Sequence, residues 1–211
     1  MTLKKLNRQE RGFTIIELMI ATSVLSIILL LVSTMMIKIG NLYQKGINQS
    51  KVQGTARTVV SDVTADLQLS GKPAPLVNDP TNPALHAYCI GESRYTFVVG
   101  KMLGNAGDTD TDGSAKSPKV LWKDKTPDTG CSTTSLDPDG TEMMPANSRL
   151  LGFSILGTSP YEVSIGIAYG DIDLLNTDVH PLDMTTNCKG SIGDQFCATA
   201  KLTTTAANRL Q

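Results

Sequence analysis

Residues 8–39 read RQERGFTIIELMIATSVLSIILLLVSTMMIKI, and this stretch decides how the chain is organised. A basic leader ends at Gly12, and an apolar run begins after Phe13 that carries one carboxylate, Glu17, in its first turn. Residues 18–37 contain no charge, no proline and no glycine. As a helix, a run of this length measures about 30 Å, which matches the hydrocarbon core of a bilayer. The sequence therefore predicts a membrane-spanning helix.

Three interpretations compete for this segment. A secretory signal peptide would have a shorter apolar core, of about 7–15 residues, followed by a small-residue cleavage site. An ordinary membrane anchor explains the length and the flanking basic residues, which predict a cytoplasmic N-terminus. Neither gives a reason for Gly12-Phe13 or for Glu17, and an acid at the edge of a membrane span by default indicates a function. The third interpretation rests on a resemblance.

Residues 11–18, RGFTIIEL, resemble the cleavage and methylation signature of type IV prepilins and of type II secretion pseudopilins. The resemblance implies that a prepilin peptidase cleaves between Gly12 and Phe13 on the cytoplasmic side and then methylates the new amino group of Phe13. A residue without a Cβ suits the scissile position. The resemblance also implies that Glu17 faces this ammonium on a neighbouring subunit, where a low dielectric favours a charge pair. The alternative for Glu17 is a carboxylate that only reaches back to the headgroups.

Four segments are expected along the chain. Residues 1–12 form a cleaved leader, residues 13–39 a transmembrane or filament-core helix, residues 40–70 an amphipathic continuation of that helix, and residues 71–211 an extracytoplasmic head. The continuation is predicted because no proline occurs before Pro73 and because apolar residues recur at helical spacing. These residues are Leu42, Ile47, Val52, Ala56, Val59, Val63 and Leu67.

The head differs in composition from the segments before it and is long enough for one domain with its own core. All ten prolines fall there, and from Gly71 onward 11 basic and 16 acidic residues give a net charge of −5. This charge argues against a nucleic-acid-binding surface. Strands are predicted at residues 94–99, 119–123, 150–156 and 162–169, and the last two form a hairpin. The predicted fold class is α+β, with a long N-terminal helix packed on an antiparallel sheet in the pilin-like manner.

Four cysteines lie in the head: Cys89, Cys131, Cys188 and Cys197. If the helix places the head outside the cell membrane, disulfides are allowed there, and an even count favours two bridges with three connectivities. We prefer Cys188–Cys197, which closes a short loop, together with Cys89–Cys131. Free or metal-binding thiols are the alternative, although no Cys-x-x-Cys occurs to suggest zinc.

Residues 108–113, DTDTDG, match the opening of a calcium loop, with candidate ligands at Asp108, Asp110 and Asp112. An EF-hand would have a bidentate glutamate at the twelfth position, which here is Lys119. The alternatives are a solvated acidic loop and a calcium site of another kind, completed across space by Asp137, Asp139 and Glu142. No other cofactor is expected.

Enzymatic motifs are missing from the sequence: it has no phosphate loop, no His-Glu-x-x-His and no Gly-x-Ser-x-Gly. Its two histidines, His86 and His180, lie in loop-rich sequence and are interpreted as surface residues. Residues 161–170, YEVSIGIAYG, and residues 196–202, FCATAKL, look like the larger minor subunits of the PilW and pseudopilin J kind.

The resemblance implies a structural subunit, not an enzyme: a minor pilin or minor pseudopilin of a type IV pilus or type II secretion-like filament. Its implied partners are the prepilin peptidase, other pilin or pseudopilin subunits and the inner-membrane assembly platform. Its implied location is the inner membrane, crossed once with the head outside, and then an extracellular or periplasmic filament. The alternative is a membrane-anchored extracytoplasmic binding protein with an uncleaved signal anchor.

Overall fold

The computed structural model describes residues 12–70, 73, 75–110, 113, 115–128, 130–134, 136–177, 182–190 and 193–209. The chain divides into two units, one up to Leu42 and one from Tyr43 onward. Helix α1 (Ile15–Ser70) belongs to both. It is followed by β1 (Val77–Asn78), β2 (Leu85–Ile90), β3 (Ser93–Val98), β4 (Leu121–Lys125), β5 (Thr141–Glu142), β6 (Ser148–Leu156), β7 (Tyr161–Tyr169), the 3-10 helices η1 (Ile172–Leu174) and η2 (Asp194–Phe196), and β8 (Ala198–Ala206).

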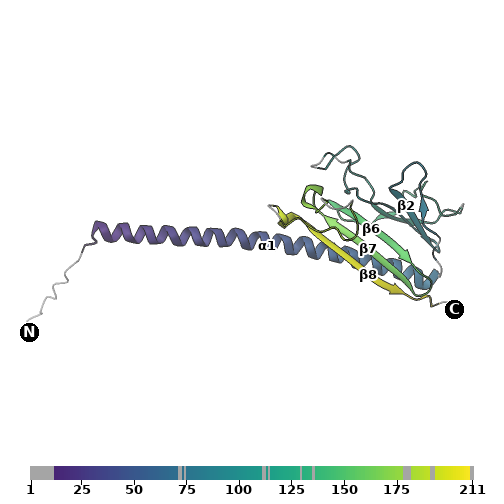
Figure 1. Ribbon diagram of the computed structural model, residues 1–211, viewed down its shortest axis with the longest axis horizontal. Coiled ribbons are helices and arrows are strands. Elements are labelled where there is room, and N and C mark those ends of the chain that lie inside the picture. The colour runs from purple at the N-terminus through teal and green to yellow at the C-terminus, as the bar shows by residue number, and fades with distance from the viewer. Residues whose placement is uncertain are drawn as a thin grey trace, which may run out of the picture. The chain divides into compact units, whose positions relative to one another are not determined.

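The strands form two antiparallel sheets, and α1 runs along them within the second unit (Figure 1). One sheet has the order β1-β2-β3-β4-β5 and the other the order β6-β7-β8. A long apolar N-terminal helix with antiparallel sheets confirms the α+β class. All four strands predicted from the sequence are present, as β3, β4, β6 and β7, and β6 and β7 pair as the expected hairpin.

Two substantial strands were not predicted, β2 and β8. Strand β8 has the sequence ATAKLTTTA, in which Leu202 is the only large apolar residue. Its alternation therefore involves small and hydroxyl side chains, which give a weak hydropathy signal. Its place in the sheet comes from its pairing with β7, which extends over the whole length of both strands, from Tyr161 opposite Ala206 to Tyr169 opposite Ala198.

The apolar residues predicted at helical spacing in the second part of α1 are buried from Val52 onward, but the two before it are not. Leu42 and Ile47 are exposed. The buried residues of α1 are Asn48, Val52, Ala56, Val59, Val60, Val63 and Leu67. Two neighbouring valines, Val59 and Val60, are both buried because the core that the helix contacts is built from both sheets, which widens the covered face.

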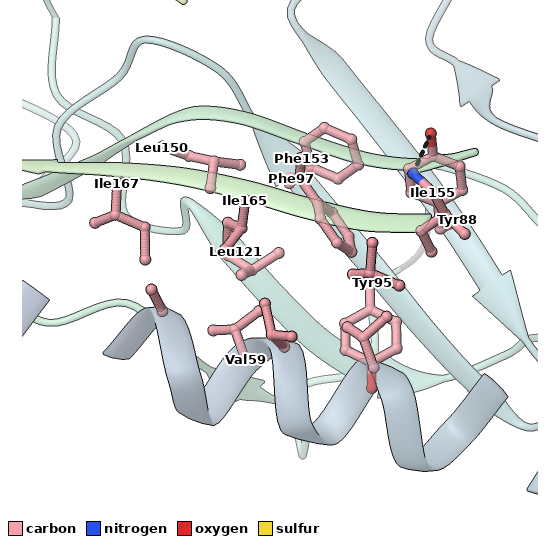
Figure 2. Close-up of a cluster of buried hydrophobic side chains, with 14 of the residues drawn as sticks. Val59, Tyr88, Tyr95, Phe97, Leu121, Leu150, Phe153, Ile155, Ile165 and Ile167 are labelled. Atoms are coloured by element: carbon pink, nitrogen blue, oxygen red, sulfur yellow. Dashed lines mark hydrogen bonds between the residues drawn. The ribbon is translucent and has the colours of Figure 1, made fainter. Parts of the chain in front are cut away.

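Figure 2 shows how that core is assembled around Val59 of α1. Ile165 and Ile167 extend from β7 towards the helix, and both are fully buried. Phe153 of β6 joins the two sheets, because its ring lies 5.3 Å from the ring of Phe97 in β3, in an edge-on arrangement. Aromatic pairs of this geometry contribute about 0.5–1.5 kcal/mol beyond the area that they bury. The alternating apolar residues predicted from residues 162–169 thus lie on a face of β7 that is buried against the core.

Both disulfides of the preferred pairing are present, Cys89–Cys131 and Cys188–Cys197. The second bridge lies on the outer face of the three-stranded sheet, in a smaller apolar cluster. That cluster is formed by Leu151, Ala168, Leu175 and Cys197, with Leu174, Leu182 and Cys188 packed around it. The bridge therefore fixes a loop over the sheet face that α1 leaves uncovered.

Arg94 forms a buried ion pair within the five-stranded sheet and also contacts the loop after Cys131. Arg94 in β3 is the register partner of Asp124 in β4, and both side chains are fully buried. Arg94 Nε donates to Asp124 Oδ1 at 2.7 Å, and Arg94 Nη2 contacts Oδ2. Arg94 Nη1 also donates to the carbonyl groups of Ser132 and Thr134, at 3.2 and 2.9 Å. The segment that the disulfide attaches is therefore also held by charge-assisted hydrogen bonds.

We expect reduction of the disulfides to destabilise the head and leave residues 15–42 helical. The bridges span 42 and 9 residues, and restriction of the unfolded chain gives about 4 and about 3 kcal/mol respectively. Hydrogen exchange should rise around residues 131–134 and 182–190. Variants that replace one pair at a time with serine separate the two effects. Four thiols that alkylate without reduction, in protein taken from the cell surface, would contradict both bridges in the mature protein.

Candidate processing and assembly site

The N-terminus of α1 is closed by a reciprocal cap between Thr14 and Glu17. The N–H of Glu17 donates to Thr14 Oγ1 at 3.3 Å, and the N–H and hydroxyl of Thr14 donate to Glu17 Oε2 at 3.3 and 3.2 Å. This is a capping box, which satisfies N–H groups that have no partner inside a helix. A carboxylate in the first turn also interacts favourably with the helix dipole. Glu17 therefore has a role within its own chain.

The sequence contains the signal for this cap, since Thr14-x-x-Glu17 is the capping-box pattern, but neither interpretation of Glu17 from the sequence, a partner for another subunit or a carboxylate near the headgroups, includes it. The geometry leaves room for both roles. Oε2 accepts both bonds from Thr14, whereas Oε1 accepts no hydrogen bond within the described residues. One oxygen caps the helix and the other is open to an external cation.

The proposed scissile bond lies just outside the helix. Gly12, Phe13 and Thr14 are exposed and non-helical, and α1 begins at Ile15. A Cβ added at Gly12 would have no heavy atom within 4 Å. The chain's own structure therefore does not require glycine at this position.

The apolar part of α1 that follows is long and apolar enough to cross a membrane. Its large apolar side chains are exposed along the described chain, as expected for a surface that faces lipid or other helices. Hydroxyl groups within the run donate to backbone carbonyls of the preceding turn: Thr22 to Met19, Ser23 to Ile20, Ser26 to Thr22 and Thr34 to Leu31. These polar groups are thus satisfied inside the helix, as a bilayer requires.

Residues 7–33 match the family described as prokaryotic N-terminal methylation motif. The match includes Gly12, Phe13, Glu17 and the first part of the apolar run. The chain therefore carries the N-terminal segment that is characteristic of type IV pilin-like and pseudopilin proteins. No curated protein and no solved structure matches the chain.

The structure describes two of the three candidate calcium ligands, Asp108 and Asp110. Asp108 is exposed, whereas Asp110 is buried and pairs with Arg149, Nη2 to Oδ2, at 2.9 Å. Asp112 lies outside the described residues. No group of three or more metal-binding side chains occurs among the described residues. Asp110 is thus turned inward to an arginine, and the sequence had no signal for that partner.

Two of the carboxylates proposed to complete a calcium site, Glu142 and Asp137, accept backbone N–H groups. Glu142 accepts the N–H groups of Val120, Leu121 and Met144, at 2.8–3.0 Å. Burial raises the pKa of Glu142, and these N–H groups oppose the rise. Asp137 Oδ1 accepts the N–H of Asp139 at 3.0 Å. These contacts make Glu142 a cap for the backbone around β4.

Proposed function

We propose that this protein is a subunit of a type IV pilus or of a type II secretion-like filament, and more narrowly a minor pilin or minor pseudopilin. The observation that carries the proposal is the methylation motif at residues 7–33, in which Glu17 occupies the first turn of a helix able to cross a membrane. The subunit is held in the inner membrane by residues 13–39, with its head outside, until an assembly platform extracts it into a filament.

Processing replaces the basic leader by a single ammonium group at the N-terminal end of the helix, and this group can pair with a neighbouring subunit. Cleavage after Gly12 removes four basic residues and one acidic residue, a net charge of +3. It creates one ammonium group, at Phe13. In lipid an isolated ammonium is costly, so it is stabilised by a carboxylate on a neighbouring helix. The open Oε1 of Glu17 is the acceptor that we assign to this role.

The proposal predicts that Gly12→Val leaves the precursor uncleaved. A β-branched side chain at the scissile position obstructs the peptidase, while the chain itself has open space at this position. Mass spectrometry of the membrane protein should find residues 1–12 still attached and no N-methyl-Phe13. Gly40→Val is the matched control, because an added Cβ there also meets nothing within 4 Å, and this variant should be processed normally.

The same measurement tests the alternative function, a binding protein held by an uncleaved anchor. Wild-type protein that retains residues 1–12 in a host with an active prepilin peptidase would favour the anchor. Normal N-methyl-Phe13 in Gly12→Val would show that the peptidase does not require glycine before the cleaved bond, and would refute the role assigned to Gly12. The minor role is tested separately, by quantifying this chain against the most abundant subunit in sheared filaments.

A further inference from the structure

Strand β8 is the last strand of the three-stranded sheet, and one of its two edges has no strand partner among the described residues. Its other edge pairs with β7 along all nine residues. Long open edges attract additional strands, and proteins commonly protect them with proline, bulges or several charges. Strand β8 contains no proline and one charged residue, Lys201.

A groove lies between this open edge and helix α1. It consists of two hollows of about 330 and 430 Å³, both lined by Arg57 and Leu202. Hydrogen bonds close the groove at both ends. Gln49 Nε2 donates to the carbonyl of Thr199 at 2.9 Å, and the N–H of Arg209 donates to the carbonyl of Gln68 at 3.3 Å. Between these bonds the strand and the helix leave a slot of defined length.

The backbone of β8 directs hydrogen-bonding groups into this slot. The carbonyl of Thr199 points away from β7, since it accepts from Gln49 on α1. Backbone groups alternate in direction along a strand, so Lys201, Thr203 and Thr205 also direct their N–H and C=O groups away from β7. These groups can pair with an added strand without disturbing the existing sheet.

Both sides of the slot carry a positive charge, Arg57 on α1 and Lys201 on β8. Arg57 and Lys201 are both exposed, and no ion pair within the described residues involves either. No acidic residue lines either hollow. Thr64 lines the larger hollow, and its hydroxyl is buried without a hydrogen-bond partner. The head as a whole has a net charge of −5. The two cations, with no acidic residue beside them in the slot, therefore favour an acidic ligand over a basic one at this site.

We propose that this groove binds an extended acidic segment of another protein, which adds to β8 as a fourth strand of the sheet. Main-chain hydrogen bonds to Lys201, Thr203 and Thr205 provide the pairing, and acidic side chains contact Arg57 and Lys201. Strand addition to an open edge is an established mode of peptide recognition. The site lies wholly within the unit from Tyr43 onward and does not depend on processing of the N-terminus.

The direct test uses the full chain in lipid nanodiscs and two labelled peptides, acetyl-Val-Glu-Val-Glu-Val-Glu-Val-amide and its counterpart with lysine in place of glutamate. Fluorescence anisotropy should give a Kd at least tenfold lower for the glutamate peptide. Hydrogen exchange should slow at Lys201, Thr203 and Thr205 when this peptide is bound. Equal affinity for the two peptides, or no binding of the glutamate peptide at millimolar concentration, would overturn the proposal.

Two variants locate the binding. Thr203→Pro removes an N–H that points into the slot, and proline is tolerated at such an edge position. This variant should lose at least tenfold in affinity. Thr203→Val is its matched control, since both changes remove the hydroxyl bond to Ser164 (2.8 Å) but valine keeps the N–H.

Arg57→Glu tests the charge at an exposed position, where folding should be unaffected, and should reverse the preference between the peptides. Binding that neither Arg57→Glu nor Thr203→Pro changes would place the peptide elsewhere. Self-association of the wild-type chain that Thr203→Pro abolishes would show instead that the edge of β8 pairs with a second copy.

Discussion

Replacing Glu17 by leucine is expected to abolish incorporation into filaments while membrane insertion and cleavage continue. The variant is more apolar, so the span still enters the bilayer. The ammonium at Phe13 of a neighbouring subunit would lose its counter-charge, and leaving one member of a buried pair unpaired costs about 3–5 kcal/mol. Incorporation should therefore fall by about a hundredfold or more. The measurement is the amount of this chain in sheared filaments relative to the membrane fraction.

The capping box requires a second pair of variants, because leucine removes both the charge and the cap. Glu17→Gln keeps the capping geometry, since glutamine also serves in a capping box, but removes the charge. Thr14→Ala keeps the charge and removes the N-cap hydroxyl, which costs about 1 kcal/mol. Glu17→Gln should assemble as poorly as Glu17→Leu, and Thr14→Ala should lose no more than about tenfold. The reverse order would show that Glu17 acts mainly as a cap.

Asp124→Ala is expected to destabilise the head more than any exposed substitution. It leaves the Arg94 guanidinium fully buried without its carboxylate, which costs about 3–5 kcal/mol. It also removes the acceptor of the Asp137 N–H, which lies 2.9 Å from Asp124 Oδ2. The loop after Cys131 should loosen together with β3 and β4.

Trp122 reports this change directly. It is the only tryptophan in the chain, it lies in β4 two residues before Asp124, and its Nε1 donates to the carbonyl of Asp137 at 3.3 Å. Urea unfolding followed by its fluorescence should show a clearly lower midpoint for Asp124→Ala. A double variant, Arg94→Met with Asp124→Leu, removes both charges and should regain most of the stability. A midpoint for Asp124→Ala equal to wild type would show that the pair contributes little.

The sequence by itself determined the N-terminal part of this protein, because every signal there is local. The apolar run is continuous, the motif occupies eight consecutive residues, and the Thr14–Glu17 cap joins positions three residues apart. The hairpin of β6 and β7 was also predictable, since apolar residues alternate strictly along β7 and a short turn joins the two strands. Local periodicity and turn chemistry are enough for such elements.

Only the tertiary structure decided which distant groups meet in the head. Arg94 and Asp124 are 30 residues apart, and Arg149 and Asp110 are 39 apart. Neither pair follows from periodicity, because each depends on which distant segments become neighbours. The contact between Asp110 and Arg149 weakens the interpretation of Asp110 as a calcium ligand, and it too could not be read from the sequence. The open edge of β8 likewise exists only because the sheet ends there, a property of strand order that no single segment of sequence contains.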